Sequence, residues 1–310
     1  MKLNKPKYWD SKNSFFSIFL FPISLIFLAF ISIKKKITKS INFNIPIICI
    51  GNIYIGGTGK TPTSIYLARE LFKLGKKPAI LRKYYKSHID EHRLIKTKIK
   101  NLILCQNRSA GIRKAENSGF DLVILDDGLQ DYKIKKNLSI VCFNQNQLIG
   151  NGLVIPSGPL RESLDALKDA NIILINGKKD NDFEEKLLKI NKNLEFFYSF
   201  FKPKNIDKFK NKKLLAIAGI GNPENFFKLL NRYDLNVEKK LIFPDHYEFT
   251  KAEIKNIIED AKSKDLQIIM TEKDYFKIKD FNEPEIKYLE VSLEIKQKEK
   301  FIKKISQFYD

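Results

Sequence analysis

Residues 51–63 read GNIYIGGTGKTPT and follow a short, β-rich apolar run, IPIICI, at 45–50. The ending GKT matches the pattern G-x-x-x-x-G-K-[ST] of a phosphate-binding loop, but Tyr54 stands where that pattern has its first glycine. A strand, a glycine turn and a helix in this order direct backbone amides and the positive end of the helix at bound phosphates. The stretch therefore predicts a nucleotide site in an α/β domain.

Each part of this loop has a predicted role with ATP. The residues expected to contact the nucleotide are Gly56, Gly57, Thr58, Gly59, Lys60 and Thr61. Glycines let the backbone approach the phosphates closely, Lys60 reaches their β and γ oxygens, and the Thr61 hydroxyl holds Mg²⁺. Pro62 suits the first turn of a helix, because the N–H that it lacks is not needed there.

Short apolar runs and amphipathic stretches alternate on the C-terminal side of the loop. A helix is expected at 63–75, because its apolar residues recur with helical spacing. Strands are expected at 78–81, 101–104, 121–125, 138–143 and 171–175, with a helix at 110–119. Strands with almost no polar interruption are typical of a parallel sheet covered on both faces. The predicted fold class is α/β, with the phosphate loop in a parallel-sheet domain.

A polar, basic segment at 201–213 predicts a domain boundary. A second, smaller α/β unit follows, with strands expected at 214–219, 267–271 and 286–291 and helices at 223–233, 251–264 and 296–308. We therefore expect three parts: a membrane-associated helix at 1–40, a nucleotide-binding domain at 41–205, and a second domain at 206–310 that closes the active-site cleft.

Residues 15–33, FFSIFLFPISLIFLAFISI, form an uncharged apolar run that is followed by Lys34, Lys35 and Lys36. With a rise of about 1.5 Å per residue, the run almost crosses a hydrocarbon core of about 30 Å. A signal peptide is disfavoured, because lysines stand where a cleavage site would lie. A spanning helix, an interfacial helix and a buried core helix are all compatible with the run. Lysines at both ends suit an anionic membrane surface, which is the expected contact.

The net charge of +20 has two explanations, a lysine-rich composition and anionic partners. Nucleic acid is not expected as a partner, because basic and aromatic residues are not interleaved and no helicase-like motifs occur. The three cysteines form no C-x-x-C pair, which favours buried free thiols over a zinc site or disulfides. The oligomeric state is not predicted.

The segment FDLVILDDGLQD at 120–131 is an apolar strand that ends in Asp126, Asp127 and Gly128. In phosphate-loop enzymes, a carboxylate at such a strand end holds Mg²⁺ beside the loop. A turn-forming D-D-G sequence is the alternative. The sequence does not decide which of the two aspartates contacts the metal.

Three further segments carry candidate residues. HIDEH at 88–92 lacks the H-E-x-x-H spacing of a metal site, so we expect a loop that carries one functional carboxylate. PSGPLRES at 156–163 predicts a rigid turn that presents Arg161 and Glu162, where the arginine suits a phosphate. In FPDHYEFT at 243–250, the histidine is either structural or an acid, base or orienting group across the cleft.

Together these segments resemble the tetraacyldisaccharide 4′-kinases, the kinases of lipid A biosynthesis. The resembling segments are GNIYIGGTGKTP, DEH at 90–92 (D-E-P in the family), DDGLQ, GNGLVIPSGPLRE at 150–162, AGIGNPENFF at 218–227, PDHYEFT and MTEKD at 270–274. They occur in the family's order and span about residues 45–275. The family's own loop also lacks the first glycine, so Tyr54 does not count against a nucleotide site.

The resemblance implies ATP- and Mg²⁺-dependent phosphorylation of the 4′-hydroxyl of a tetraacylated glucosamine disaccharide 1-phosphate, which forms lipid IVA. It places the enzyme at the cytoplasmic face of the bacterial inner membrane, anchored through the N-terminal helix. It also implies two α/β/α domains with the active site in the cleft. A membrane-associated phosphate-loop NTPase that acts as a switch or motor is the alternative. The segment NGKKD at 176–180 does not match the base-reading motif of a GTPase.

Residue roles carried over from the family are expectations. Asp90 acts on the acceptor hydroxyl and is oriented by His246, while Lys60 binds the nucleotide phosphates. The metal is expected at Thr61, Asp126 and Glu91, and the substrate at Asp127, Gly128, Gln130, Arg161 and Glu162.

Three segments of this sequence differ from the family's motifs. The family's S-R-G-Y-G is LRKYYK at 81–86, where Arg82 and Tyr84 match. The histidine after DDGLQ is Asp131, and the proline after D-E is His92.

Overall fold

The structure is a computed structural model that describes residues 6–11, 14–245 and 247–309. The chain divides into two compact units. Within the described residues, the larger unit takes 6–84, Asn101–Phe200 and 294–309, and the smaller unit takes Tyr85–Lys100 and Phe201–Leu293. The segment at 85–100 thus groups with the chain beyond residue 200. The sequence-based boundaries 1–40, 41–205 and 206–310 stay a prediction.

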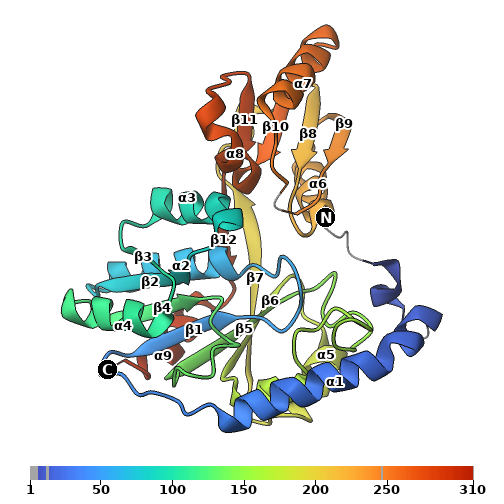
Figure 1. Cartoon of the computed structure of the whole chain (residues 1–310). Helices are drawn as coiled ribbons and strands as arrows, with labels where there is room; N and C mark the ends of the chain where they lie inside the picture. The colour runs from blue at the N-terminus through green and yellow to red at the C-terminus, as the bar shows by residue number, and fades with distance from the viewer. Residues whose placement is uncertain (1–5, 12–13, 246, 310) are drawn as a thin grey trace. The chain divides into compact units, whose positions relative to one another are not determined.

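An eight-stranded sheet forms the centre of the larger unit, with the order β12-β7-β6-β5-β1-β4-β2-β3 (Figure 1). Its strands are β1 (Ile47–Gly51), β2 (Pro78–Lys83), β3 (Leu102–Cys105), β4 (Leu122–Asp126), β5 (Leu138–Asn144), β6 (Ile172–Asn176), β7 (Glu195–Pro203) and β12 (Val291–Ile295). Strands β1 to β7 pair in parallel, and β1 lies between β4 and β5. The segments that follow β1 and β4 therefore meet at the carboxyl edge of the sheet, where open α/β sheets bind ligands.

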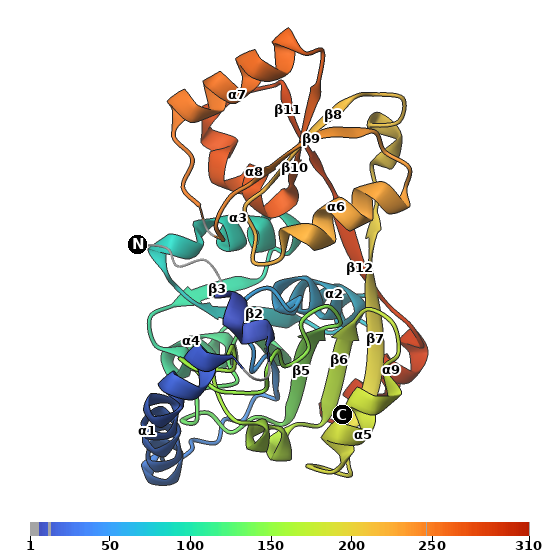
Figure 2. The same ribbon diagram turned by 90° about the vertical axis from the view of Figure 1, so that its right-hand side faces the viewer.

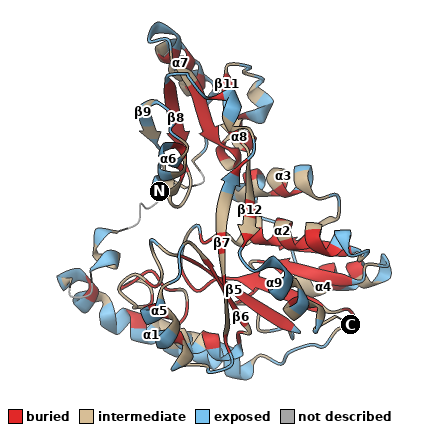
Figure 3. Cartoon of the chain, turned by 180° about the vertical axis from the view of Figure 1, so that it is seen from behind, coloured by how far each residue is buried: buried red, intermediate tan, exposed pale blue. Residues whose placement is uncertain are grey.

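Helices flank this sheet. Those of the larger unit are α1 (Phe15–Ile37), α2 (Lys60–Lys73), α4 (Arg108–Asn117), α5 (Asn181–Leu188) and α9 (Lys298–Ser306), with the 3₁₀ helices η1 (Lys7–Asp10) and η3 (Leu164–Asp169). Helix α2 packs on β1, β2 and β4, and α4 packs on β2, β3 and β4. Strands β1, β4 and β5 are buried along their whole length (Figure 3). These buried parallel strands confirm the predicted α/β fold. Of the three cysteines, all free, Cys49 and Cys142 are buried as expected, whereas Cys105 is only partly buried.

Two strands of the sheet, β7 and β12, are absent from the sequence-based prediction. The sequence predicts a single strand at 286–291, whereas the structure has β11 (Ile286–Leu289) and β12 in different sheets. Glu290 lies between the two strands, and its backbone groups form hydrogen bonds with the residues that follow β7. Its carbonyl accepts a hydrogen bond from the Lys204 N–H (2.8 Å), and its N–H donates to Asn205 Oδ1 (2.9 Å).

The smaller unit contains a four-stranded parallel sheet with the order β11-β10-β8-β9. Its other elements are β8 (Leu214–Ala218), β9 (Val237–Ile242), β10 (Gln267–Thr271), α3 (Ile89–Lys98), α6 (Pro223–Arg232), α7 (Lys251–Ser263), α8 (Glu272–Ile278), η2 (Lys86–His88), η4 (Ile206–Lys208) and η5 (Lys279–Phe281). Helices α6 and α7 lie on opposite faces of the sheet (Figure 2). Phe227 and Leu230 of α6 belong to one apolar cluster, and Ile254 and Ile258 of α7 belong to another. The unit is therefore an α/β/α sandwich.

The prediction that HIDEH lies in a loop is wrong, because α3 begins at Ile89. Helix α3 packs against α8, and its residues His92 and Ile95 are buried. Asp90 and Glu91 lie in the first turn, where negative charge is favourable beside the positive end of the helix. The sequence hides this helix because its buried face includes a histidine and an aspartate.

Candidate nucleotide site

The phosphate loop joins β1 to α2 at the carboxyl edge of the larger sheet (Figure 1). Gly56 and Gly59 have φ angles of +113° and +93°, which side chains other than glycine rarely adopt. Tyr54 is fully buried and forms a β-bridge with Leu160, so packing fixes this part of the loop. The Thr58 hydroxyl is buried and has no hydrogen-bond partner among the described residues, which suits a group that meets a ligand.

Asp126 forms the buried centre of a polar cluster at the start of α2. The hydroxyl of Thr61 donates to one of its carboxylate oxygens (3.1 Å), and that of Ser64 donates to the other (3.1 Å). Arg82 forms an ion pair with Asp126 and donates to the Thr61 hydroxyl (3.1 Å). The structure thus brings two predicted metal ligands, Thr61 and Asp126, together. Ser64 and Arg82 also belong to this cluster. The sequence points only to Arg82, which matches the arginine of the family's S-R-G-Y-G segment.

Asp127 contacts two other cations, Lys60 and Arg161. It has a left-handed φ of +62°. A carboxylate oxygen lies 3.1 Å from Arg161 Nη1 and 3.7 Å from Lys60 Nζ. Burial alone raises the pKa of Asp127, but the charges of Lys60 and Arg161 outweigh burial and hold this pKa well below its usual range. Burial lowers the pKa of Lys60, which Asp127 opposes. Lys60 and Arg161, the cations predicted to meet phosphate, are thus paired with a carboxylate.

The rest of the DDGLQ segment connects the two aspartates to the phosphate loop. Gln130 Nε2 donates to the Asn52 carbonyl (3.0 Å). Gly128 is required by packing, since a Cβ there would lie 2.9 Å from Leu125 Cβ. Asp131, which replaces a family histidine, pairs with Arg108 (3.3 Å). Gln130 and Gly128 therefore hold the site's shape, and substrate contact by either residue stays a prediction.

Arg161 and Glu162 follow the turn that the sequence predicted. The Arg161 N–H donates to the Ile53 carbonyl (2.7 Å), which joins this segment to the phosphate loop. Glu162 is buried, and its Oε2 accepts a hydrogen bond from the Tyr132 hydroxyl (2.6 Å). Burial, followed by that bond, raises the pKa of Tyr132. Arg161 thus reaches Asp127, whereas Glu162 is engaged by Tyr132.

The same turn packs against the N-terminal helix. Ser24 Oγ of α1 lies within hydrogen-bond distance of the Val154 carbonyl (2.8 Å) and of Ser157 Oγ (2.9 Å). Ser17 accepts a hydrogen bond from Asn151 Nδ2 (3.1 Å). Both serines are buried, whereas most large apolar side chains of α1 are exposed. Helix α1 is therefore attached to the larger unit through its polar side.

A second group of predicted residues lies in the smaller unit. Lys273 of α8 places its Nζ 2.9 Å from Glu91 Oε1, 3.2 Å from Asp245 Oδ1 and 3.9 Å from Asp90 Oδ2. Asp90 is 1% exposed. Lys273 is a candidate that the sequence analysis did not single out, although it lies in MTEKD. His246 lies outside the described residues.

The polar cluster of the larger unit offers oxygen atoms of the kind that bind Mg²⁺. Within the described part of the chain, no group of three His, Cys, Asp or Glu side chains could hold a metal ion. Mg²⁺ commonly takes only one or two protein ligands and completes its shell with water and substrate phosphates. The Thr61 hydroxyl, which is hydrogen-bonded to the Asp126 carboxylate, meets that requirement as a protein oxygen.

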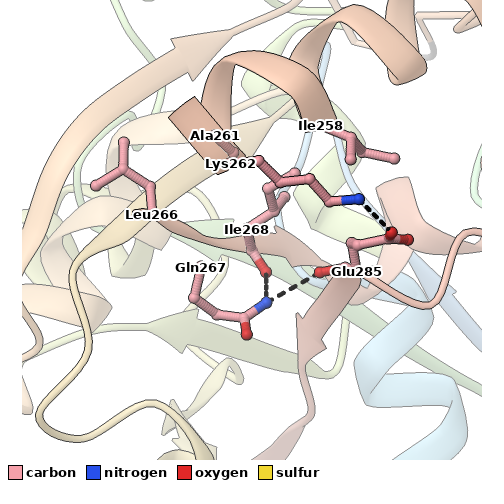
Figure 4. A pocket seen from close by; sticks show the side chains of 7 residues that line it. All are labelled: Ile258, Ala261, Lys262, Leu266, Gln267, Ile268 and Glu285. Atoms are coloured by element: carbon pink, nitrogen blue, oxygen red, sulfur yellow. Dashed lines mark hydrogen bonds and ion pairs between the residues drawn. The ribbon is translucent and has the colours of Figure 1, made fainter. Parts of the chain in front are cut away.

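A surface pocket of the smaller unit contains none of the candidate residues (Figure 4). Lys262 of α7 and Glu285 form an ion pair across it (2.8 Å). Gln267 donates to the Ile268 and Glu285 carbonyls (3.2 and 2.9 Å). These bonds tie α7, β10 and the start of β11 together, so the pocket's polar groups have structural partners.

Comparison with known proteins places this geometry in a family. The model of the tetraacyldisaccharide-1-P 4'-kinase family matches residues 16–310. The tetraacyldisaccharide 4'-kinase of Pelagibacter ubique (strain HTCC1062) is 40% identical, covering 98% of both chains. That of Francisella tularensis subsp. novicida (strain U112) is 33% identical, covering 93% of this chain and 98% of the relative.

A solved structure shares the fold. The crystal structure of the "apo" form of LpxK from Aquifex aeolicus, in complex with ATP, matches with a TM-score of 0.71 at 23% identity. The match covers 95% of this chain and 99% of that one. Together with the family model and the two relatives, this likeness confirms the resemblance first seen in the sequence motifs. The chain belongs to the tetraacyldisaccharide-1-P 4'-kinase family.

Proposed function

We propose that this protein transfers the γ-phosphoryl group of ATP to the 4′-hydroxyl of a tetraacylated glucosamine disaccharide 1-phosphate, giving lipid IVA. Family membership supports the kinase activity. The observation that carries the proposal is the phosphate loop with Lys60 and Arg161 beside it. The alternative, a switch or motor, is not favoured, since the named relatives are kinases.

The residues of the loop would bind and orient ATP. The glycine amides and the N-terminus of α2 would face the phosphates. Lys60 and Arg161, which pair with Asp127 in the structure, would leave this carboxylate and bind the γ-phosphate. Bound Mg²⁺ would supply positive charge that neutralises the negative charge developing during transfer. Thr61, oriented by Asp126, would hold it. Positioning and charge neutralisation are the main requirements of phosphoryl transfer.

In the smaller unit, Asp90 would accept the proton of the 4′-hydroxyl. Lys273 holds the carboxylates of Asp90, Glu91 and Asp245 in one group, and Asp90 Oδ1 accepts the Glu91 N–H (2.9 Å). These contacts give the Asp90 carboxylate a defined orientation. Orientation of Asp90 by His246 and metal contact by Glu91 are further parts of the proposal.

Helix α1 would hold the enzyme at the cytoplasmic face of the inner membrane. It is long and apolar enough to cross a membrane. However, its buried serines bond the 151–157 turn, while Phe15, Phe19 and Ile26 are 75%, 70% and 72% exposed. This amphipathic attachment supports a helix that lies in the interface, with Lys34 to Lys36 near anionic headgroups.

The proposal is tested by measuring ADP formation with purified protein, ATP and Mg²⁺, with and without the disaccharide 1-phosphate in mixed micelles. We expect ADP formation to depend on the acceptor and to equal the lipid product. Lys60→Ala is the inactive control. Hydrolysis that proceeds equally without acceptor would favour the switch or motor.

A further inference from the structure

Arg82 forms a buried ion pair with Asp126 beside the phosphate loop. Arg82 of β2 and Asp126 of β4 are register partners in neighbouring strands, so their side chains lie on the same face of the sheet. The guanidinium pairs with Asp126 Oδ2 and donates to the Thr61 hydroxyl (3.1 Å). Arg82 is 5% exposed and Asp126 is 0% exposed. This ion pair is therefore shielded from water and fixed by strand register.

Both oxygens of Asp126 have donors. Ser64 Oγ donates to Oδ1 (3.1 Å), while Thr61 and Arg82 donate to Oδ2. A carboxylate attracts a divalent ion most strongly when no neighbouring cation balances its negative charge. Arg82 balances the charge of Asp126, and three donors take up three of its roughly four lone-pair sites. The Arg82–Asp126 pair therefore has almost no net charge and attracts a metal ion only weakly.

We propose that Arg82 is an internal cation that keeps divalent metal out of the site until nucleotide arrives. Asp126 is then a positioning residue that orients the Thr61 hydroxyl. The protein supplies this hydroxyl, and the phosphates of ATP supply the negative charge that draws Mg²⁺ in. The inference rests on the proposed nucleotide site and assigns the order of binding within it.

The physical reason is the strength of charge interactions in a buried site. A divalent ion bound at Thr61 would lie a few ångströms from the guanidinium, where repulsion amounts to several kcal/mol even at an effective dielectric of about 20. Mg²⁺ also gives up its water reluctantly. A single hydroxyl and a neutralised carboxylate do not offset these costs, whereas triphosphate oxygens do.

The test is binding of Mn²⁺, a paramagnetic substitute for Mg²⁺, to the nucleotide-free full-length protein, followed by electron paramagnetic resonance. We expect Arg82→Gln to bind Mn²⁺ at least ~10-fold more tightly than the wild type, a conservative fraction of the repulsion removed. Adding Asp126→Asn to Arg82→Gln should abolish the gain. Arg93→Gln removes the same charge from an ion pair with Asp280 in the smaller unit and should leave Mn²⁺ affinity unchanged.

Two results would overturn the proposal. One is an unchanged Mn²⁺ affinity in an Arg82→Gln variant whose circular dichroism and melting show a folded protein. The other needs no variant: wild-type protein that binds Mn²⁺ equally well with and without a non-hydrolysable ATP analogue. Neither readout involves the lipid acceptor, so failure of the kinase assay and failure of this inference are separate outcomes.

Discussion

Replacing Asp127 by Asn should strengthen binding of ATP in the absence of metal. In the structure this carboxylate lies 3.7 Å from Lys60 Nζ and 3.1 Å from Arg161 Nη1. ATP must draw both cations away from Asp127 before they can bind phosphate. Asn keeps the shape of the side chain and removes its charge, so the cations become available without that competition.

The size of the effect follows from the Lys60 distance of 3.7 Å. Unit charges at about this separation attract by about 4 kcal/mol at an effective dielectric of ~20. Solvent screens much of this attraction, because the Asp127 side chain is 25% exposed. A remainder of about 1–2 kcal/mol corresponds to a Kd lower by roughly 5- to 30-fold.

The assay is calorimetric titration of wild type and Asp127→Asn with a non-hydrolysable ATP analogue in the presence of a chelator. The matched control is Asp131→Asn, which removes a carboxylate from the same segment that pairs with Arg108 instead. We expect its Kd to stay near that of the wild type. An unchanged or weaker affinity in folded Asp127→Asn would refute the idea that this carboxylate competes with phosphate.

Four further outcomes are expected. Lys60→Ala should abolish turnover, measured as lipid product, while circular dichroism stays unchanged. Asp90→Ala should lower kcat by at least ~10²-fold; near-normal turnover would reject its role as the base. Because the folded-state pKa of Asp127 lies below its ordinary 3.8, this residue stabilises the fold above that pH, and the contribution is lost in acid. Chemical denaturation should therefore show a weaker loss of stability below about pH 4 in Asp127→Asn than in the wild type. Phe19→Asp on the exposed face of α1 should reduce flotation with anionic vesicles and leave nucleotide affinity intact; unchanged flotation would argue against membrane contact through this face.

The sequence predicts the larger sheet well because its strands are continuous apolar runs. Strands β1, β4 and β5 are buried on both sides, so their composition alone identifies them. Strand β9, VEKKLI, alternates partly buried and exposed residues at a sheet edge, and it was not predicted. Helix α3 was missed because His92 and Asp90 contribute to its buried side.

The candidate site divides in the same way. Local motifs singled out Lys60, Thr61 and the two aspartates as candidates, because each motif lies within a few residues of a strand end. Contacts made through tertiary pairing were not predictable, since no local pattern joins Arg82 to Asp126 or Lys273 to Glu91. Which of the two aspartates faces Lys60 and Arg161 is likewise set by backbone shape, here the left-handed φ of Asp127.

The most direct test of the central claim is to locate the phosphate in the product. Purified protein, ATP and Mg²⁺ are incubated with the tetraacylated disaccharide 1-phosphate in micelles, and the lipid is analysed by mass spectrometry and phosphorus NMR. We predict one added phosphate on the 4′-oxygen, absent with Lys60→Ala. Folded wild-type protein that leaves the lipid unphosphorylated, or phosphorylates another position, would contradict the proposed function.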